Sequence, residues 1–306
     1  MFAGKGIEMI KTTGIKKANI LQGIDFAMKQ GEMVAVMGPS GSGKSTLMYM
    51  LSGMDKVSEG KIFFQGKDIT NCSEEESARM RLQKMGFVFQ QMNMLPNLSI
   101  LDNIILPAIE YQKQLERENR VGEKELVEKA KKLMEKIGIS GLEERKISEV
   151  SGGQLQRVCI CRALMNDPEI LLADEPTGAL NRSASEEVMK ELVRLNREGM
   201  SILIVTHDSK VASCCSRVLY LVDGKIAGEY RADSDDYHGK VVLKKEDTGK
   251  KYLGKEDPGK EDLEKEDPGK EDLKKEDPEK EDPEKEDQIK ERNEKRLNSW
   301  LAEHDW

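Results

Sequence analysis

The sequence predicts an α/β domain with a parallel sheet at its core, and three apolar segments carry this prediction. Met33–Gly38, Glu169–Asp174 and Ser201–Thr206 each contain an unbroken apolar run, which is typical of parallel strands covered on both faces. Helical sequence separates the second segment from the third, and such alternation of strands and helices favours a parallel sheet. The first segment ends in glycine, so its strand should lead directly into a loop.

Two insertions and one further strand are expected around this core. Residues 1–32 and 57–70 contain short strand-like pieces with turn signals, which predict a small antiparallel β layer. Residues 95–150 are rich in Leu, Ile, Glu and Lys at helical spacing, so they predict a mostly helical subdomain. Val218–Val222 predicts a strand that ends in a hairpin turn at residues 223–224. The helices expected in the core are Lys44–Gly53, Ala184–Arg197 and Asp208–Cys214.

A charged repeat follows the globular part, which is expected to span residues 1–243. Residues 244–287 contain twelve lysines and nineteen acidic residues, and Lys-Glu-Asp recurs every five residues. The repeat has too few apolar side chains for their burial to offset the conformational entropy lost on folding. This tail is therefore predicted to be disordered. Residues 288–306 are a candidate short helix, because Leu297, Trp300 and Leu301 would share one face.

Composition excludes several classes of protein. The net charge is −8, most of which lies in the repeat, so the body lacks the basic face that nucleic-acid binding needs. An odd number of cysteines without framework spacing predicts reduced thiols and a cytoplasmic location. No signal segment opens the sequence, and no run reaches the ~18–20 apolar residues that cross a bilayer, so a membrane role would depend on a partner.

A glycine-rich segment, GPSGSGKST, follows the first predicted strand and opens a predicted helix. It matches the phosphate-binding pattern G-x-x-x-x-G-K-[ST] in the context that supports this motif. Glycines let backbone N–H groups approach phosphate oxygens, and the helix start is electrostatically positive. Lys44 should reach the β- and γ-phosphates, and Ser45 should offer its hydroxyl to Mg²⁺. The residues predicted to bind nucleotide here are Gly38, Pro39, Ser40, Gly41, Ser42, Gly43, Lys44, Ser45 and Thr46.

Two adjacent acids, Asp174 and Glu175, lie at the end of the ILLAD strand. Paired carboxylates are costly without a cation nearby, which argues against a purely structural role. Asp174 is predicted to hold Mg²⁺ through water, and Glu175 to polarise the attacking water as general base. The phosphate-binding loop and this acidic pair together predict nucleoside-triphosphate hydrolysis.

A second candidate anion-binding helix start lies at the SGGQ segment, before a helix expected at Leu155–Met165. The sequence offers no second phosphate-binding loop that this segment could serve. We therefore expect it to bind the nucleotide of another subunit, in a homodimer or heterodimer of ATP-binding subunits. The predicted contact residues are Ser151, Gly152, Gly153 and Gln154.

Taken in order, GKST, SGGQ, LLADEP and the histidine after SILIVT resemble the ATP-binding subunit of an ABC transporter, over about residues 7–230. The resemblance implies a P-loop ATPase core with an antiparallel β layer and a helical signature subdomain. It also implies ATP and Mg²⁺ as ligands, and a separate permease that keeps the subunit at the inner face of the cell membrane.

The resemblance also implies roles for individual residues. Gln90 is similar to the family's Q-loop glutamine, which helps to ligate Mg²⁺; Gln91 competes for this place, although the preceding Phe-Val-Phe pattern favours Gln90. His207 resembles the switch histidine that contacts the γ-phosphate. Residues 177–181 resemble the D-loop, in which Asn181 replaces the usual aspartate.

Other positions depart from the family or lie outside its motifs. Val150 stands where the signature usually begins with leucine. No aromatic residue lies between Phe2 and Phe26 to stack on adenine, and Thr13 is near the corresponding place. His238 and His304 are expected on the solvated surface.

Residues 90–107 and 173–180 resemble one branch of the family, which serves lipoprotein release, macrolide efflux and antimicrobial-peptide resistance. Its permeases resemble long-helix membrane proteins with large external domains, so export or peptide resistance is the expected role. The alternatives are a soluble ABC ATPase, a slow-turnover regulatory subunit and an importer ATPase. Deleting residues 244–306 is expected to leave ATPase activity nearly intact.

Overall fold

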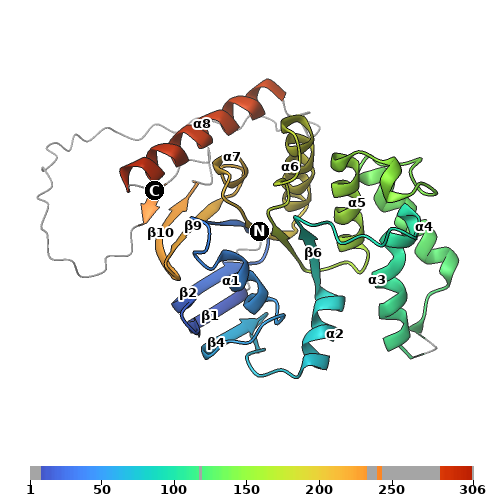
Figure 1. Ribbon diagram of the computed structural model, residues 1–306, viewed down its shortest axis with the longest axis horizontal. Coiled ribbons are helices and arrows are strands. Elements are labelled where there is room, and N and C mark those ends of the chain that lie inside the picture. The colour runs from blue at the N-terminus through green and yellow to red at the C-terminus, as the bar shows by residue number, and fades with distance from the viewer. Residues whose placement is uncertain (1–7, 117–118, 233–239, 243–282, 305–306) are drawn as a thin grey trace, which may run out of the picture.

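The computed structural model describes residues 8–116, 119–232, 240–242 and 283–304. Its strands form a seven-stranded sheet in the order β11-β10-β9-β3-β8-β7-β6 and a four-stranded sheet in the order β2-β1-β4-β5. In Figure 1 the smaller sheet lies below the centre, helices α3–α5 lie to the right, and α8 crosses the top. His238 and most of the charged repeat fall outside the described residues.

The larger sheet has a parallel centre and antiparallel strands at one edge. Strands β6, β7, β8, β3 and β9 pair in parallel, whereas β10 and β11 continue the sheet in antiparallel fashion. Residues of β3 alternate between two apolar cores, one on each face of the sheet, which explains their unbroken apolar run. The strands are β3 (Met33–Met37), β6 (Met85–Phe89), β7 (Ile170–Asp174), β8 (Ser201–Val205), β9 (Arg217–Val222), β10 (Lys225–Arg231) and β11 (Lys240–Val242).

Strand register brings the ends of the central strands together. Phe89 pairs with Asp174, and Asp174 pairs with Val205, which also pairs with Val36 of β3. Because these strands are parallel, the loops that follow them meet at one edge of the sheet, where α/β proteins commonly bind ligands. Loops separated by more than a hundred residues in sequence therefore contribute to one site.

The smaller sheet is antiparallel throughout, which confirms the β layer expected from the sequence. Its inward side chains share an apolar core with helix α1 (Lys44–Leu51) and with one face of the larger sheet. This shared core fixes the helix that follows the phosphate-binding loop. The strands are β1 (Glu8–Lys17), β2 (Leu21–Lys29), β4 (Glu59–Phe64) and β5 (Lys67–Asp68).

Helices cover the other face and one end of the larger sheet. Three of them begin with a capping box, in which a serine hydroxyl accepts from a backbone N–H three residues on, at Ser73, Ser99 and Ser151. Each such cap contributes about 1 kcal/mol to helix stability. The helices are α2 (Glu74–Lys84), α3 (Ile100–Gln114), α4 (Glu123–Lys136), the 3₁₀ turn η2 (Ile147–Glu149), α5 (Gly152–Leu164), α6 (Arg182–Arg197) and α7 (Ser209–Ala212).

All five cysteines have free thiols. Cys159 and Cys161 lie buried on α5, and burial raises the pKa of the Cys159 thiol to about 11. These residues therefore pack as small apolar side chains.

Helix α8 (Pro283–Glu303) differs from the expectation for the tail. It begins within the repeat, so the prediction of disorder is wrong for residues 283–287. Its first residue is proline, which is tolerated at the first position of a helix. Leu297, Trp300 and Leu301 are buried in the main core, and burying such side chains stabilises by about 1.5–3 kcal/mol each. His304, expected at the solvated surface, is half-buried with Nδ1 2.7 Å from the Trp300 carbonyl oxygen.

None of the helices in the described part of the chain is long and apolar enough to cross a membrane.

Candidate nucleotide-binding and catalytic site

The loop between β3 and α1 has a backbone shape that requires glycine. Gly38 has φ +147°, and a Cβ there would lie 2.0 Å from the Leu221 carbonyl oxygen. Gly43 has φ +100°, and a Cβ there would lie 2.7 Å from Cδ2 of Leu21. A side chain at either position would collide with its neighbour, so glycine fixes the course of the loop into the helix.

Lys44 begins α1 and lies back across this loop. Its Nζ donates hydrogen bonds to the carbonyl oxygens of Gly38 at 2.9 Å and Pro39 at 2.8 Å. Burial lowers the pKa of Lys44, while the carboxylates of Glu175 and Asp174 act in the opposite direction. The ammonium group therefore lies between the loop and the two acids at the end of β7.

The other residues of the loop differ in their exposure. Pro39, Ser40 and Gly41 are exposed, whereas Ser42 is buried and its Oγ has no hydrogen-bond partner among the described residues. Thr46 is half-buried in the first turn of α1.

Asp174 connects the loop to the adjacent strand. Its Oδ1 accepts a hydrogen bond from Ser45 Oγ at 3.1 Å, and its Oδ2 accepts one from the Tyr49 hydroxyl at 3.2 Å. Burial is the main cause that raises the pKa of Asp174; Glu175 adds to it, and the two hydrogen bonds oppose it. The carboxylate is thus oriented by two residues of one helix face, four positions apart. Sequence reasoning missed Tyr49, whose signal was its spacing from Ser45.

Glu175 forms a second pair with His207. His207 Nδ1 lies 2.7 Å from Glu175 Oε1, and Thr206 Oγ1 donates to Glu175 Oε2 at 3.2 Å. The Glu175 side chain is 16% exposed and that of His207 is 71% exposed, so the pair opens to solvent through the histidine. Glu175 also has φ +46°, which is uncommon for a residue other than glycine and is found at functional sites.

Gln90 reaches the same edge from the end of β6. A Cβ placed on Gly178 would lie 2.9 Å from Gln90 Nε2, so the glutamine amide rests against the D-loop. Gln90 and Gln91 are both exposed, but this contact places Gln90 beside the acidic pair.

The SGGQ segment forms the start of α5 and packs on the D-loop and α6. Ser151 Oγ accepts from the Gln154 backbone N–H at 3.2 Å, which closes the capping box. A Cβ on Gly153 would lie 2.8 Å from the Ala184 Cβ, so glycine permits close approach of α5 to α6. Ser151 and Gly152 are exposed at this helix start.

Asn181 caps α6, and its Oδ1 accepts from the Ala184 backbone N–H at 2.9 Å. An asparagine makes this cap as well as the usual aspartate does, but without its negative charge.

Another residue beside the loop was missed by sequence reasoning. Ile20 is 41% exposed, and its Cγ2 would lie 3.3 Å from a Cβ on Gly43. An apolar surface therefore borders the phosphate-binding loop, whereas Thr13 is an exposed residue of β1.

Comparison with known proteins identifies the architecture. Residues 21–178 match the family model described as ABC transporter. The ABC transporter ATP-binding protein YknY of Bacillus subtilis, described as uncharacterized, is 40% identical over 226 residues, which cover 71% of this chain and 95% of that protein. The chain belongs to the ABC transporter family. It is an ATP-binding domain that hydrolyses ATP.

The chain is also similar to proteins from several ABC transporter systems. The lipoprotein-releasing system ATP-binding protein LolD of Aquifex aeolicus is 40% identical and is covered over 97% of its length. The macrolide export ATP-binding/permease protein MacB of Pasteurella multocida is 42% identical, but the chain spans only 32% of that protein. The dimeric structure of MJ0796, a bacterial ABC transporter cassette, matches over its full length and 74% of this chain, with TM-score 0.67 and 36% identity.

Proposed function

We propose that this ABC cassette powers export by a separate membrane permease and works as a dimer that binds two ATP. The observation that carries this proposal is the pair of acids at the end of β7, one held by Ser45 and the other by His207. The direction proposed is export, which is supported by the similarity to LolD and MacB, since these two proteins are named for lipoprotein release and macrolide export. The cassette would then lie at the inner face of the membrane through its permease.

Nucleotide phosphates are proposed to lie on the loop between β3 and α1, where backbone N–H groups and the start of α1 favour an anion. The Lys44 ammonium would then exchange its bonds with loop carbonyls for bonds with phosphate oxygens. The residues that would hold Mg²⁺ are Ser45, Gln90 and Asp174, whose oxygen donors suit this ion. The Asp174 carboxylate is half-buried and already bonded to Ser45 Oγ. Bound Mg²⁺ would supply positive charge that stabilises the phosphates.

Glu175 is proposed to accept the proton of the attacking water as general base. His207 and Thr206 each contact one of its carboxylate oxygens and so hold the group in one orientation. The other ring nitrogen of His207 would contact the γ-phosphate and stabilise the charge that develops there.

The second half of each site is proposed to come from the partner cassette. Ser151 and Gly152 are exposed at the start of α5 and would offer backbone N–H groups to the partner's γ-phosphate. The dimeric MJ0796 cassette supports this arrangement. Asn181, on the D-loop between the SGGQ segment and Glu175, would respond to closure of the dimer.

Tyr49→Phe is expected to weaken Mg²⁺-dependent ATP binding and turnover by about three- to tenfold, because a typical hydrogen bond contributes about 0.5–1.5 kcal/mol net. Loss of the hydroxyl would release Oδ2 of Asp174 while leaving Ser45 in place. Binding of a fluorescent ATP analogue is measured across a Mg²⁺ titration and again with EDTA. A defect of equal size without Mg²⁺ would contradict a role through Asp174.

Capture of the partner tests the transport role directly. Tagged Glu175→Gln protein is mixed with MgATP and gently solubilised source membranes, and co-purifying proteins are identified. A multi-span permease with a large external domain is the expected result. The control is the Lys44→Ala/Glu175→Gln double variant, which should not stabilise the complex with ATP. Recovery of ribosomes, nucleic acid or only soluble proteins would contradict the proposal.

A further inference from the structure

Helix α8 lies outside residues 21–178, the part of the chain that matches the family model. MJ0796 is matched over its full length, yet the match covers 74% of this chain. Figure 1 shows α8 lying across the top of the molecule, above α7 and beside α6. The helix packs against α7 (Ser209–Ala212), which begins two residues after His207.

The C-terminal half of α8 packs into the main apolar core of the domain. Trp300 is 2% exposed and meets Tyr220 of β9 edge-on, with ring centroids 6.5 Å apart. Its ring also lies 5.8 Å from that of Tyr230 on β10. Leu297 is fully buried in the core that includes Val211 of α7. This half of the helix is thus anchored to two strands and to α7.

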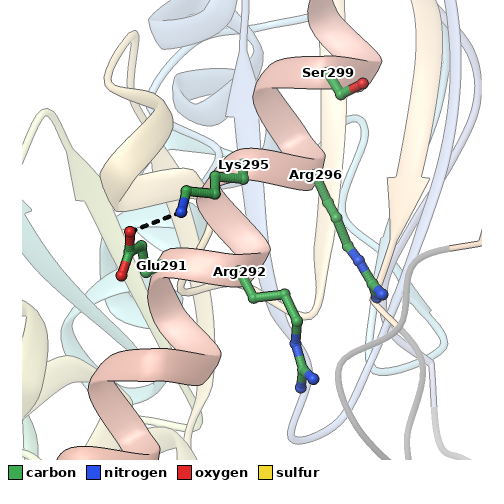
Figure 2. Close-up of a pocket in the computed structure, with 5 residues that line it drawn as sticks. All are labelled: Glu291, Arg292, Lys295, Arg296 and Ser299. Atoms are coloured by element: carbon green, nitrogen blue, oxygen red, sulfur yellow. Dashed lines mark ion pairs between the residues drawn. The ribbon is translucent and has the colours of Figure 1, made fainter.

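The middle of α8 forms one wall of a hollow of about 690 Å³ that also contains the catalytic pair. Lys290, Glu291 and Glu294 line it together with Glu175 and His207. Figure 2 shows Glu291 paired along the helix with Lys295, at 2.8 Å, while Arg292 and Arg296 extend in another direction. The same helix therefore combines an apolar anchor with a polar wall of the active site.

Helix α7 links the anchor to the catalytic histidine. It contains only Ser209–Ala212, directly after Asp208, whose side chain accepts from the Lys210 backbone N–H. A single helical turn is unstable by itself, so its position depends on what packs against it. Because His207 lies two residues before this turn, its distance from Glu175 depends on the same packing.

We propose that α8 positions the loop of residues 206–212, named the switch loop here because it carries His207, and that Trp300 is a positioning residue for the His207–Glu175 pair. A lid would cover the histidine, but the His207 side chain remains 71% exposed with α8 in place. The helix therefore positions the switch loop through its packing on α7 and leaves the His207 side chain accessible. This inference rests on the proposed roles of Glu175 and His207, and it reverses the expectation that removal of the tail leaves turnover intact.

Trp300→Ala in the full chain is expected to lower kcat for ATP about tenfold, since small displacements of catalytic groups cost this much or more. The dissociation constant for MgATP should change less than about twofold, because the phosphate-binding loop does not contact α8 in the proposed arrangement. Trp300→Phe should recover most of the rate by keeping a ring against Tyr220 and Tyr230. Hydrogen exchange of residues 206–212 should accelerate in the alanine variant.

Asn298→Ala, on the exposed face of the same helix, is the matched control and should leave kcat and exchange unchanged. Leu301→Ala, at the edge of the anchor, provides a milder lesion if Trp300→Ala folds poorly. An unchanged kcat with accelerated exchange would overturn the proposal, as would a rise in kcat, which indicates inhibition by α8. Equal losses in kcat and in ATP affinity would indicate general destabilisation and would also overturn the proposal. Failure of Glu175→Gln to slow turnover would instead overturn the catalytic assignment on which the proposal rests.

Discussion

Glu175→Gln is expected to stop ATP turnover while MgATP remains bound. The amide has the size of the carboxylate, and the hydrogen bond from Thr206 Oγ1 can still reach its oxygen. It cannot accept a proton from water, and loss of a general base typically costs about 10²–10⁴-fold in rate. Binding should persist because Lys44 and the phosphate-binding loop are unchanged, so the bound nucleotide should hold two cassettes together.

Phosphate release and sedimentation with MgATP measure these two effects on one sample. The variant should show a residual rate below about 1% of the parent and a shift to dimer that disappears in EDTA. Glu75→Gln, whose side chain is 85% exposed on α2, is the matched control and should behave as the parent. Parent-like turnover in Glu175→Gln would assign the proton transfer to another group.

Much of the candidate site can be predicted from local sequence, because each of its parts is a short continuous segment. The glycines of the phosphate-binding loop, the apolar strand before Asp174 and the serine cap of α5 each depend on neighbours within a few residues. Parallel register then brings the ends of β3, β6, β7 and β8 to one edge, which follows from alternating strands and helices. The nucleotide site could therefore be assembled from motifs before its geometry was known.

Contacts made across long stretches of chain were harder to predict. Tyr49 acts on Asp174, which is 125 residues away, and only its spacing of four residues from Ser45 signals this contact. Helix α2 and strand β6 were not predicted as elements, although the capping box at Ser73 was a usable signal. The apolar face of α8 was visible, but its docking depends on Tyr220 and Tyr230 and could not be inferred from the helix alone.

Lys44→Ala is expected to abolish ATP binding at micromolar nucleotide, with a loss of affinity of about a hundredfold, in the upper range for a hydrogen bond between charged groups. The loop would lose two supports, since Nζ bonds the carbonyl oxygens of Gly38 and Pro39. The site would also lose the cation beside Asp174 and Glu175, and their negative charges would then oppose the incoming phosphates. Backbone N–H groups at the start of α1 remain, so weak phosphate affinity should survive.

Calorimetric titration with MgATP and with MgADP separates the two contributions of Lys44. If Lys44 reaches the γ-phosphate, its removal should lower the affinity for ATP more than the affinity for ADP. If Lys44 only shapes the loop, its removal should lower both affinities equally. Lys113→Ala, at an exposed position of α3 where the lysine pairs with Glu110, controls for loss of a surface cation. Unchanged ATP affinity in Lys44→Ala would remove the phosphate-binding loop from the site. Equal losses for ATP and ADP would keep the loop but reassign stabilisation of the γ-phosphate to His207 and the partner's SGGQ segment.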